Sequence, residues 1–482
     1  MISSELFVDK EQVLQECVVM EGNGFRLLTM FAQEDADGQI VNILFRKKDR
    51  VARIAYRPGL EAVSLSDDIR SALPYERLMA EMSGIVFDNG SRASIVYRRK
   101  GEGYPLQKTP YDRSTEVRIP IPRNHTVGDD VFEIPVGPVH AGIIEPGHFR
   151  FSVAGESVIE LNPSLGYTHR GVEKLLEMPA ETDNSRLVER ISGDTCVANC
   201  IAYSEMMESG CTIPKRAKHI RTILAEMERL YNHIGGVAGV CTDTAFTVPS
   251  AIGGGIQEKV FRMNVGLTKH RQLMNSVVPG GVRRDIPDSK LKELDDFLIS
   301  LKFEMEDLAD MMDSPALLDR METTGILRRD KAWSIGTVGP IARASGIATD
   351  VRKEVPYECY GDLGMNMITN DKGDVFARTQ VRLGEITESV SLIHQCIQSI
   401  EPGEFRIRPR AEDGFRCAVV EAPRGELVHC AVIGDGKIWR YNVRDPSFMN
   451  WFGMCYAVPG NVVPDFPLIN KSFGLSYSGN DL

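Results

Sequence analysis

The sequence has few cysteines and no closely spaced pair of them. Its 482 residues include ten cysteines, and none of these forms a C-x-x-C motif. This content is too low for a disulfide-built scaffold, which favours a reducing, cytoplasmic compartment. The nearest pair, Cys196 and Cys200, has the spacing of one helix face, where two thiolates could share a metal. Because a tetrahedral site needs two more ligands, we expect these thiols to be reduced and packed in the core.

Long hydrophobic runs are also absent. No apolar stretch reaches the roughly 18 residues that a membrane-spanning helix needs. Residues 1–10 mix polar and acidic side chains and do not resemble a signal peptide. The net charge of −11 argues against a nucleic-acid partner and against direct binding to an anionic membrane. Attachment to the cytoplasmic face of a membrane is therefore expected to come through partner subunits.

The chain is long enough for two to four domains, and its composition is that of a globular protein. Residues 1–116 are predicted to form an α+β domain, with two strands within 43–56 and a helix over 75–83 that stops at Gly84. A linker rich in proline and acidic residues, 117–136, is predicted to be extended. The rest of the chain, 137–482, is predicted to be mainly α, with a long helix bundle and small β elements.

Three apolar periodicities predict the helices of that bundle. The first helix opens at Pro214 and closes at Gly235-Gly236, the second follows Pro287, and the third covers 375–400. A β-hairpin is predicted across 427–443, where Asp435-Gly436 supplies the turn. The glycines of 253–255 are expected in a loop without the context of a dinucleotide-binding fold, so no NAD site is expected in this chain.

Eight blocks of sequence resemble, in order, one superfamily. It comprises the large subunits of formate hydrogenlyase and energy-converting [NiFe] hydrogenases and the 49-kDa-type subunit of respiratory complex I. The N-terminal part adds two segments, 75–85 and 103–108, that resemble motifs of the 30-kDa-type subunit, although Tyr104 replaces the usual histidine. The eight blocks are 137–140, 145–150, 167–174, 189–193, 279–285, 343–347, 350–357 and 421–427.

The resemblance implies a metal site whose ligands are missing. The family holds Ni-Fe with four thiolates, from R-x-C-G-x-C and from the C-terminal D-P-C-x-x-C. Here the four cysteine positions read Ser192, Thr195, Ser476 and Gly479. Hydroxyl groups stay protonated at neutral pH and are poor ligands for soft metals, so no Ni-Fe centre is expected. Cys196 lies one residue beyond Thr195, a rotation of about 100° on a helix, and is not expected to replace it.

The superfamily's other use of this pocket is quinone reduction. By the resemblance, the quinone-binding histidine and tyrosine of complex I fall at Pro146 and near Glu181, so both carriers are expected to be absent. His140, His148 and Tyr167 remain candidates for a quinone or acceptor pocket. His169 is a further histidine near that pocket, and for each histidine a purely structural hydrogen bond is the alternative.

Four charged residues of the family site are retained as catalytic candidates. They are Glu145, Glu189, Arg190 and Arg424. In the family, the counterpart of Glu145 lies near the metal and that of Arg424 lies over the metal's diatomic ligands. A buried glutamate with a raised pKa could relay protons. The alternative for each residue is a structural ion pair.

Three functions follow from the resemblance. The first is the large subunit of a membrane-associated, complex-I-like oxidoreductase that has lost Ni-Fe and couples electron transfer to proton or ion translocation. The second is a non-catalytic, pseudo-hydrogenase scaffold of such a complex, and the third is a quinone-reducing subunit. The implied partners are a small iron–sulfur subunit of the complex I 20-kDa type, a ferredoxin-like subunit and antiporter-like subunits of a membrane arm. Because the sequence ends at Leu482, no extension of the kind removed in hydrogenase maturation is expected.

Overall fold

The structure is a computed structural model, and it describes most of the chain. The described residues are 2–90, 95–96, 103–108, 128, 130–140, 144–180 and 182–482. The predicted boundary at residue 116 and most of the predicted linker lie outside these ranges. The end of that linker is not an open, unpaired segment, because residues 131–136 form a strand that pairs with the strand beginning at His148. No helix within the described ranges is both long and apolar enough to cross a membrane.

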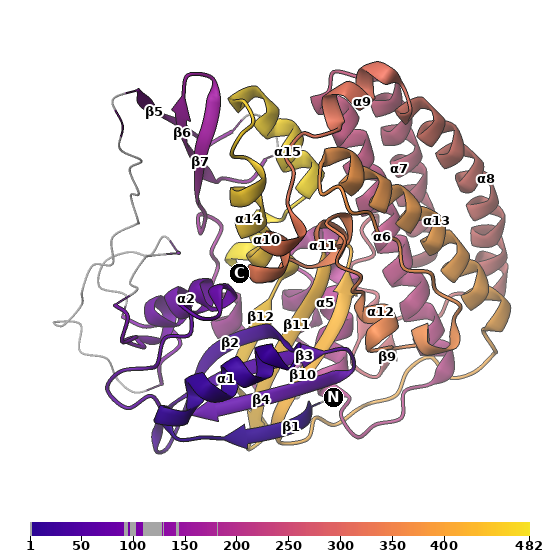
Figure 1. Cartoon of the computed structure of the whole chain (residues 1–482). Helices are drawn as coiled ribbons and strands as arrows, with labels where there is room; N and C mark the ends of the chain where they lie inside the picture. Colours follow the sequence, from indigo (N-terminus) through magenta and orange to yellow (C-terminus); the bar gives the residue numbers. More distant parts are fainter. Residues whose placement is uncertain are drawn as a thin grey trace.

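The N-terminal part is a four-stranded sheet with helices packed on it (Figure 1). Its strands have the order β1-β4-β3-β2, and β1 runs parallel to β4 while the other neighbours are antiparallel. The strands and helix predicted within 43–56 and 75–83 are confirmed as β3, β4 and α2. The bounds of these elements are β1 (Ile2–Phe7), α1 (Val13–Gly22), β2 (Arg26–Asp35), β3 (Gly38–Lys47), β4 (Arg50–Tyr56) and α2 (Leu73–Ser83).

A second sheet lies against the N-terminal sheet. It consists of β10 (Gly414–Ala422), β11 (Gly425–Gly434) and β12 (Lys437–Arg444), and the turn between β11 and β12 is the predicted hairpin. Side chains of β12 reach across the seam: Arg440 Nε donates to the Ala32 carbonyl at 2.9 Å, and Arg444 Nε donates to the Leu28 carbonyl at 3.0 Å. The two sheets are therefore joined by buried hydrogen bonds as well as by apolar packing.

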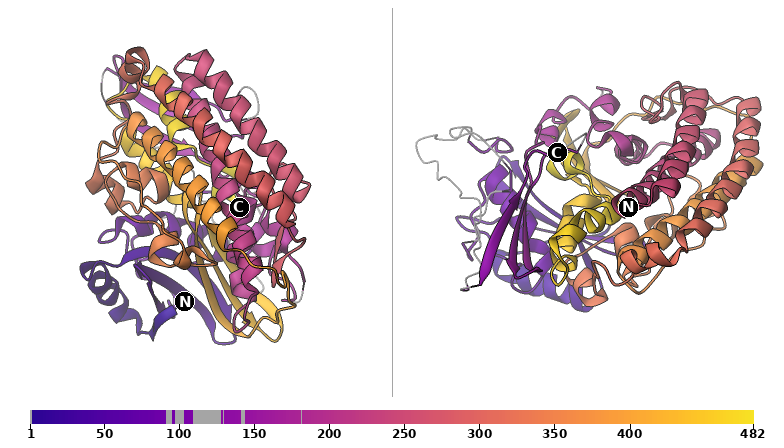
Figure 2. Two further views of the ribbon diagram at one scale, coloured as in Figure 1. Left: turned by 90° about the vertical axis from the view of Figure 1, so that its right-hand side faces the viewer. Right: turned by 90° about the horizontal axis from the view of Figure 1, so that it is seen from above.

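Four long helices form the bundle beside the second sheet (Figure 2). The three helices expected from periodicity are confirmed as α6, α8 and α13, and α7 joins them. Their bounds are α6 (Lys215–Asp243), α7 (Thr247–Thr268), α8 (Asp288–Met312) and α13 (Val375–Ser399). The helix α5 (Cys196–Met207) crosses between this bundle and the second sheet, packing on β10 and β11.

Two predictions from glycines are wrong. The first helix does not close at Gly235-Gly236 but continues to Asp243, and the glycines 253–255 lie inside α7 rather than in a loop. A Cβ at Gly235 would clash with the Gln257 side chain, and one at Gly253 would come within 2.9 Å of the Ala238 Cβ. Gly235 and Gly253 allow α6 and α7 to pack closely, and this packing outweighs their weak helix propensity.

The C-terminal segment fills the space between the bundle and a third sheet. This sheet contains β5 (Val131–Val136), β6 (His148–Ala154) and β7 (Ser157–Ser164). The C-terminal helices are α14 (Pro446–Ala457), α15 (Phe466–Phe473) and α16 (Tyr477–Asp481). The chain end lies near the middle of Figure 1 rather than at the rim. The shorter elements are α3 (Val172–Leu175), α4 (Ser185–Val188), β8 (Val277–Val278), β9 (Gly281–Val282), α9 (Pro315–Met321), α10 (Arg329–Ser334), α11 (Gly339–Ala344) and α12 (Val351–Glu354).

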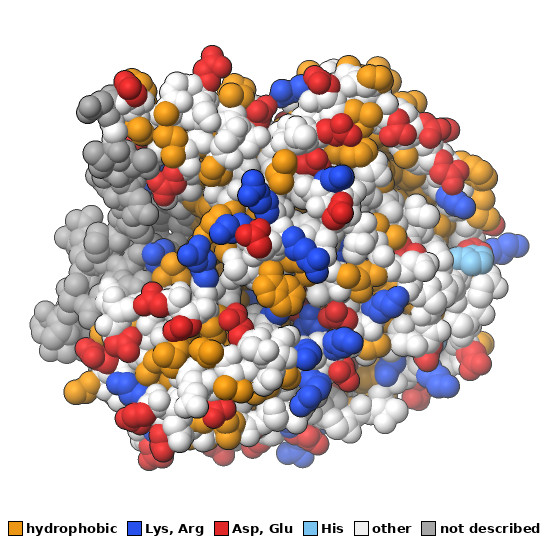
Figure 3. Space-filling view, in the orientation of Figure 1, with side chains coloured by type: hydrophobic (Ala, Val, Ile, Leu, Met, Phe, Trp, Pro, Cys, Tyr) orange, Lys and Arg blue, Asp and Glu red, His pale blue; other side chains and the backbone are white. Residues whose placement is uncertain are grey.

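Charge is distributed differently on the surface and in the core. On the face seen in Figure 3, acidic and basic side chains are interspersed, so the net charge is not gathered there in one patch. Inside the molecule, a cluster of ion pairs lies where α6, α13 and β10 meet, with Arg343 and Arg352 at its centre. Buried charges are tolerated only when they are paired, and most pairs in this cluster bridge segments far apart in sequence.

Candidate functional site

The structure brings two of the four family cysteine positions into direct contact. Ser192 precedes the short turn that leads into α5, and Ser476 caps α16, 284 residues later. Their hydroxyl oxygens are 2.9 Å apart, which is a hydrogen bond, and both residues are buried. The motif around Ser192 and the C-terminal motif around Ser476 therefore meet at one site.

The other two cysteine positions, Thr195 and Gly479, lie beside the serine pair but contribute no further side-chain hydroxyl to the Ser192–Ser476 contact. Thr195 Oγ1 faces the Ser192 carbonyl at 3.4 Å and accepts a hydrogen bond from Asn199 Nδ2 at 3.3 Å, at the start of α5. Gly479 donates its N–H to Ser476 Oγ at 2.9 Å. A Cβ on Gly479 would lie 2.6 Å from Asp445 Oδ2, so the Asp445 carboxylate occupies the space into which a side chain at 479 would project.

Arg424 is paired with an aspartate that the sequence analysis did not select. Its Nη1 lies 3.0 Å from Asp194 Oδ1 and its Nη2 contacts the other oxygen, a bidentate arrangement, while Nε donates to the Gly474 carbonyl at 2.7 Å. Burial alone would raise the pKa of Asp194, but the Arg424 guanidinium and the Ser192 hydroxyl outweigh burial and hold it below its usual value. Asp194 is therefore an anion in this site.

Glu145 lies at the outer edge of the site formed around Ser192 and Ser476. Its carboxylate is exposed and accepts the N–H of Ser478 at 3.0 Å. Arg170 donates to the carbonyl of Ser478 at 2.8 Å and to that of Ile191 at 3.0 Å, so it ties the tail to the Ser192 loop. Burial lowers the pKa of Arg170, and the nearby Glu145 carboxylate opposes this. The predicted residue Glu145 is thus near Ser476 and reaches the solvent.

Glu189 and Arg190 are adjacent in sequence but lie in different environments. Glu189 is buried, and its carboxylate accepts the backbone N–H of Asn275. Burial raises the pKa of Glu189. The Arg190 side chain is 58% exposed, lies 3.7 Å from the Glu189 carboxylate and donates to the Arg186 carbonyl at 2.6 Å. Glu189 holds a loop in place, whereas Arg190 faces the surface.

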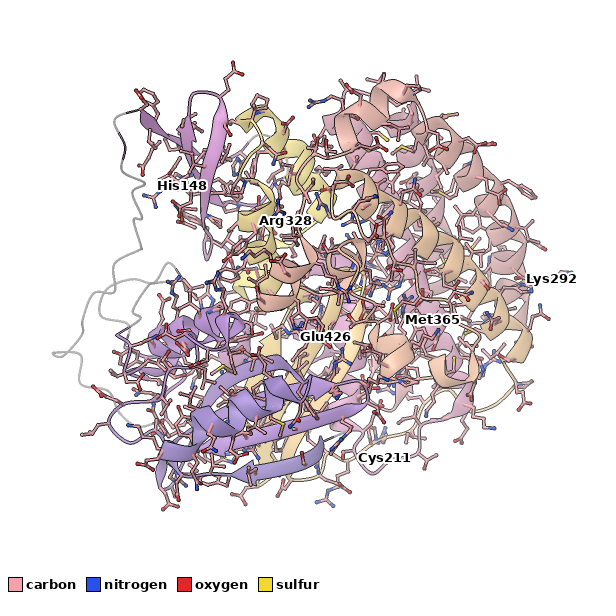
Figure 4. All side chains as sticks on the ribbon, viewed as in Figure 1. His148, Cys211, Lys292, Arg328, Met365 and Glu426 are labelled. Carbon is pink, nitrogen blue, oxygen red and sulfur yellow. The ribbon has the colours of Figure 1, made fainter. Side chains whose placement is uncertain are left out.

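The candidate histidines make loop-bracing contacts. His140 Nε2 lies 2.8 Å from the Gly147 carbonyl, and His148 Nδ1 lies 3.3 Å from the Gly137 carbonyl, so both link residues 137–140 to the start of the third sheet. Figure 4 labels His148 on that sheet. His169 Nδ1 lies 2.7 Å from the Asp481 carbonyl and helps to clamp the tail. These contacts match the structural alternative for each histidine.

The histidine contacts do not test the other positions of the predicted acceptor pocket. Tyr167 is half-buried in the loop between β7 and α3. Pro146, at the aligned histidine position, is also half-buried in the segment before β6. Glu181, near the aligned tyrosine position, lies outside the described residues. A quinone or acceptor pocket formed by His140, His148 and Tyr167 stays a prediction.

The thiols of α5 are packed. Cys196 Sγ lies 2.8 Å from the Gln272 carbonyl, and Cys200 Sγ lies 3.5 Å from the Ser185 carbonyl. Burial raises the pKa of both thiols well above its usual value, so they are protonated at neutral pH. Within the described ranges, no three His, Cys, Asp or Glu side chains gather as a set of metal ligands.

The tail is held at its end by a second aspartate. Asp481 accepts the backbone N–H groups of Gly166 and Thr168, each at 2.9 Å, and the Thr168 hydroxyl at 2.7 Å. The Leu482 carbonyl accepts the N–H of Arg170 at 2.8 Å. Of the residues that sequence reasoning missed, Asp194 could have been found inside the 190–195 motif. No spacing in the sequence points to Asp445 or Asp481.

Comparison with known proteins gives consistent matches over most of the chain. A family model described as the 49-kDa subunit of respiratory-chain NADH dehydrogenase matches residues 243–413 and 408–481. Formate hydrogenlyase subunit 5 of Escherichia coli (strain K12) is 30% identical over 440 residues, covering 87% of this chain and 77% of that protein. Hydrogenase-4 component G of the same strain is 32% identical over 433 residues, covering 88% and 72%. The C/D component of NADH-quinone oxidoreductase from Phocaeicola vulgatus is 29% identical over 423 residues, covering 81% of each.

Proposed function

The chain belongs to the family of complex I 49-kDa subunits and [NiFe]-hydrogenase large subunits, and we propose that it is the large subunit of a membrane-associated oxidoreductase that has lost Ni-Fe. In this proposal it couples electron transfer from an iron–sulfur partner subunit to the movement of protons or ions. The relatives named above are components of formate hydrogenlyase, hydrogenase and NADH-quinone oxidoreductase. We also propose the corresponding division of the fold, an α+β unit at 1–116 and a mainly α unit at 137–482.

One observation carries the proposal: the residues at the four ligand positions do not fit a Ni-Fe centre. Ligands of a tetrahedral metal with bonds of about 2.3 Å are roughly 3.7 Å apart, whereas the Ser192 and Ser476 oxygens are in hydrogen-bond contact at 2.9 Å. Neither hydroxyl is a soft anionic donor. At the fourth position, the Asp445 carboxylate takes the place of a side chain. No step of the proposed function therefore passes through a metal in this chain.

The charges that remain support redox-linked proton movement. An electron that arrives on a partner's cluster adds negative charge, and nearby carboxylates then bind protons more tightly. Glu145 is exposed at the edge of the site around Ser192 and Ser476, and Asp194, paired with Arg424 in the same site, is partly exposed. Both carboxylates are therefore accessible to solvent at one site.

The second candidate function is the non-catalytic scaffold. The observation that favours it is that all three nitrogens of the Arg424 guanidinium donate hydrogen bonds, to Asp194 and to the Gly474 carbonyl. An arginine occupied in this way is a structural link between β10–β11 and the tail. The scaffold and the redox-linked function differ in one measurable respect, the effect of pH on the partner's cluster.

A redox titration at several pH values tests the proposal. In the complex purified with its iron–sulfur subunit, we expect the midpoint potential of the cluster nearest this chain to fall with pH, by up to about 59 mV per pH unit for a one-electron couple. Glu145→Gln should reduce that slope, because it removes an exposed carboxylate from the edge of the site. The readout is the electron paramagnetic resonance signal of the cluster at pH 6, 7 and 8.

The matched control is Glu156→Gln, since Glu156 is an exposed glutamate at the turn between β6 and β7, close in sequence to Glu145. This variant should titrate like the wild type. A potential independent of pH in the wild type, with no change in Glu145→Gln, would favour the scaffold and reject redox-linked proton movement at this site.

A further inference from the structure

The segment between α13 and β10 carries three arginines at alternate positions. Exposed and half-buried side chains alternate along residues 404–410, and the exposed basic ones are Arg406, Arg408 and Arg410. Such an alternation is typical of an extended chain with one face turned outward. We propose that this segment, the arginine ribbon (residues 404–410), is a docking surface for an acidic, extended segment of another polypeptide. The inference does not depend on the function proposed above.

The arginine ribbon is held in place by the block 279–285, which the candidate functional site does not use. The N–H of Val282 donates to the Phe405 carbonyl at 3.1 Å, and the N–H of Ile407 donates to the Gly280 carbonyl at 2.9 Å. A Cβ on Gly280 would clash with the Ile407 carbonyl. Glycine at this position therefore lets the ribbon lie directly against β9, and the backbone of the ribbon is fixed there by hydrogen bonds.

The guanidinium groups of the ribbon are not used inside the protein. Within the described ranges they make no hydrogen bond, ion pair or ring contact, and the same holds for the exposed Arg284 at the end of β9. Other surface arginines differ: Arg262 and Arg271 of the α7 region both pair with Glu258. The arginines of the ribbon therefore remain available to carboxylates that come from outside the chain.

The acidic residues beside the ribbon do not neutralise it. Asp285 pairs with Arg216 Nε at 2.7 Å, and Glu412 pairs with Arg416 Nη2 at 3.2 Å. The ribbon itself contains three arginines and one glutamate, which is an excess of two positive charges. Because the whole chain has a net charge of −11, the ribbon is a local basic site on an acidic protein. Such a site attracts a partner segment of the opposite charge.

The ribbon also has a free backbone edge. Its pairing with β9 uses the backbone groups of Phe405 and Ile407. In the part of the chain that the structure describes, the N–H and carbonyl groups of Arg406 and Arg408 have no hydrogen-bond partner. Successive residues of a strand direct these groups to opposite edges. The edge away from β9 can therefore receive another strand, which is a common mode of peptide recognition.

The spacing of the arginines fits the side chains of an added strand. Alternate residues of an extended chain lie about 6.5–7 Å apart, so carboxylates at alternate positions of a partner strand have the same spacing as the guanidinium groups. Each guanidinium can then donate charge-assisted hydrogen bonds to one carboxylate. A nucleic acid fits less well, because the net charge of −11 repels its dense row of phosphates.

Peptide binding to the purified full-length chain tests the docking surface. The probe is a fluorescein-labelled peptide in which glutamate and valine alternate, and binding is followed by fluorescence anisotropy. A peptide of the same composition with all its glutamates in one block should bind about 10-fold more weakly, because its carboxylates no longer match the ribbon. Hydrogen exchange of the segment that contains Arg406 and Arg408 should become slower when the alternating peptide is bound.

The double variant Arg406→Gln/Arg408→Gln should weaken binding of the alternating peptide by about 10-fold or more with an unchanged melting temperature, since both side chains are exposed. The matched control is Arg328→Gln/Arg329→Gln, which removes the same charge from exposed positions at the start of α10 and should bind like the wild type. Equal weakening in both variants, or no binding to the wild type, overturns the docking surface. Preferential binding of phosphatidylserine vesicles or of a single-stranded oligonucleotide at the ribbon overturns the assignment to an acidic polypeptide.

Discussion

Replacing Arg343 with methionine should destabilise the protein strongly. The guanidinium is fully buried, with Nε 2.8 Å from Glu385 Oε1 and Nη1 2.8 Å from both Glu421 Oε1 and the Thr349 carbonyl. Asp350 lies 3.4 Å away. The substitution would leave Glu385 and Glu421 buried without this cation. Breaking a buried ion pair in this way costs about 3–5 kcal/mol, a large share of the total stability of roughly 5–15 kcal/mol.

The neighbouring groups cannot absorb the loss. Arg352 is already committed to Asp350 at 2.7 Å and to Glu226 at 3.1 Å. Burial raises the pKa of Glu421 to about 7, with the negative charge of Asp350 adding to it and Arg343 opposing it. Without Arg343 we expect Glu421 to become protonated at neutral pH, which limits the damage and does not remove it.

The measurement is thermal unfolding with soluble yield as a second readout. Arg343→Met should lower the melting temperature by roughly 5–10 °C or prevent soluble expression. Arg262→Met is the control, since Arg262 is exposed on α7 and pairs with Glu258 one turn earlier, where an ion pair is worth at most about 1 kcal/mol. Equal melting temperatures for the two variants would show that the buried cluster does not contribute as proposed.

Restoring a cysteine at Gly479 should weaken the tail rather than rebuild a ligand. The new Cβ would lie 2.6 Å from Oδ2 and 2.8 Å from Cγ of Asp445, which no relaxed structure tolerates. Asp445 is itself held by the N–H of Ser447 at 2.8 Å, so the carboxylate cannot simply swing away. Overpacking of this kind typically costs about 1–3 kcal/mol.

A double-mutant cycle with Asp445 identifies the cause. Asp445→Ala alone should cost about 1 kcal/mol, because Asp445 caps α14. In the double variant the clash is gone, so its melting temperature should lie above the value expected from adding the two single effects. Gly254→Cys, at a helical glycine with open space around it, is the control for introducing a cysteine. Strictly additive effects would mean that Asp445 and position 479 do not compete for space.

Much of the helical framework was predictable because its information is local. Apolar residues repeat with the helix period through α6, α8 and α13, and Asp435-Gly436 marks a hairpin turn by its own conformational preference. Gly235 and Gly253 were misjudged because each faces the neighbouring helix, whereas Gly254 and Gly255 have open space around them. Local propensity is outweighed by packing wherever two helices approach closely, and one sequence does not reveal such a partner.

The site was predictable only in part for a similar reason. The positions of Ser192 and Ser476 follow from two motifs, and their contact at 2.9 Å agrees with that assignment of the motifs. The partners that now fill the site come from elsewhere: Asp445 from the end of β12, and Asp481 from the tail itself. Neither aspartate belongs to a motif, because the contact of each depends only on how distant segments pack together.

Hydrogen bonds hold the C-terminal tail at this site. The tail is held by the Ser192–Ser476 pair, by Arg424 at the Gly474 carbonyl and by Asp481 at the loop 166–168. Each of these contacts is a hydrogen bond to an oxygen atom.

The metal content of the intact complex tests the central claim most directly. The complex should be purified without oxygen through a tag on this chain, dialysed against a chelator and measured by inductively coupled plasma mass spectrometry. We expect no stoichiometric nickel, and iron only in the amount that the partner's iron–sulfur clusters explain. One tightly bound nickel per chain, retained through dialysis, would contradict it.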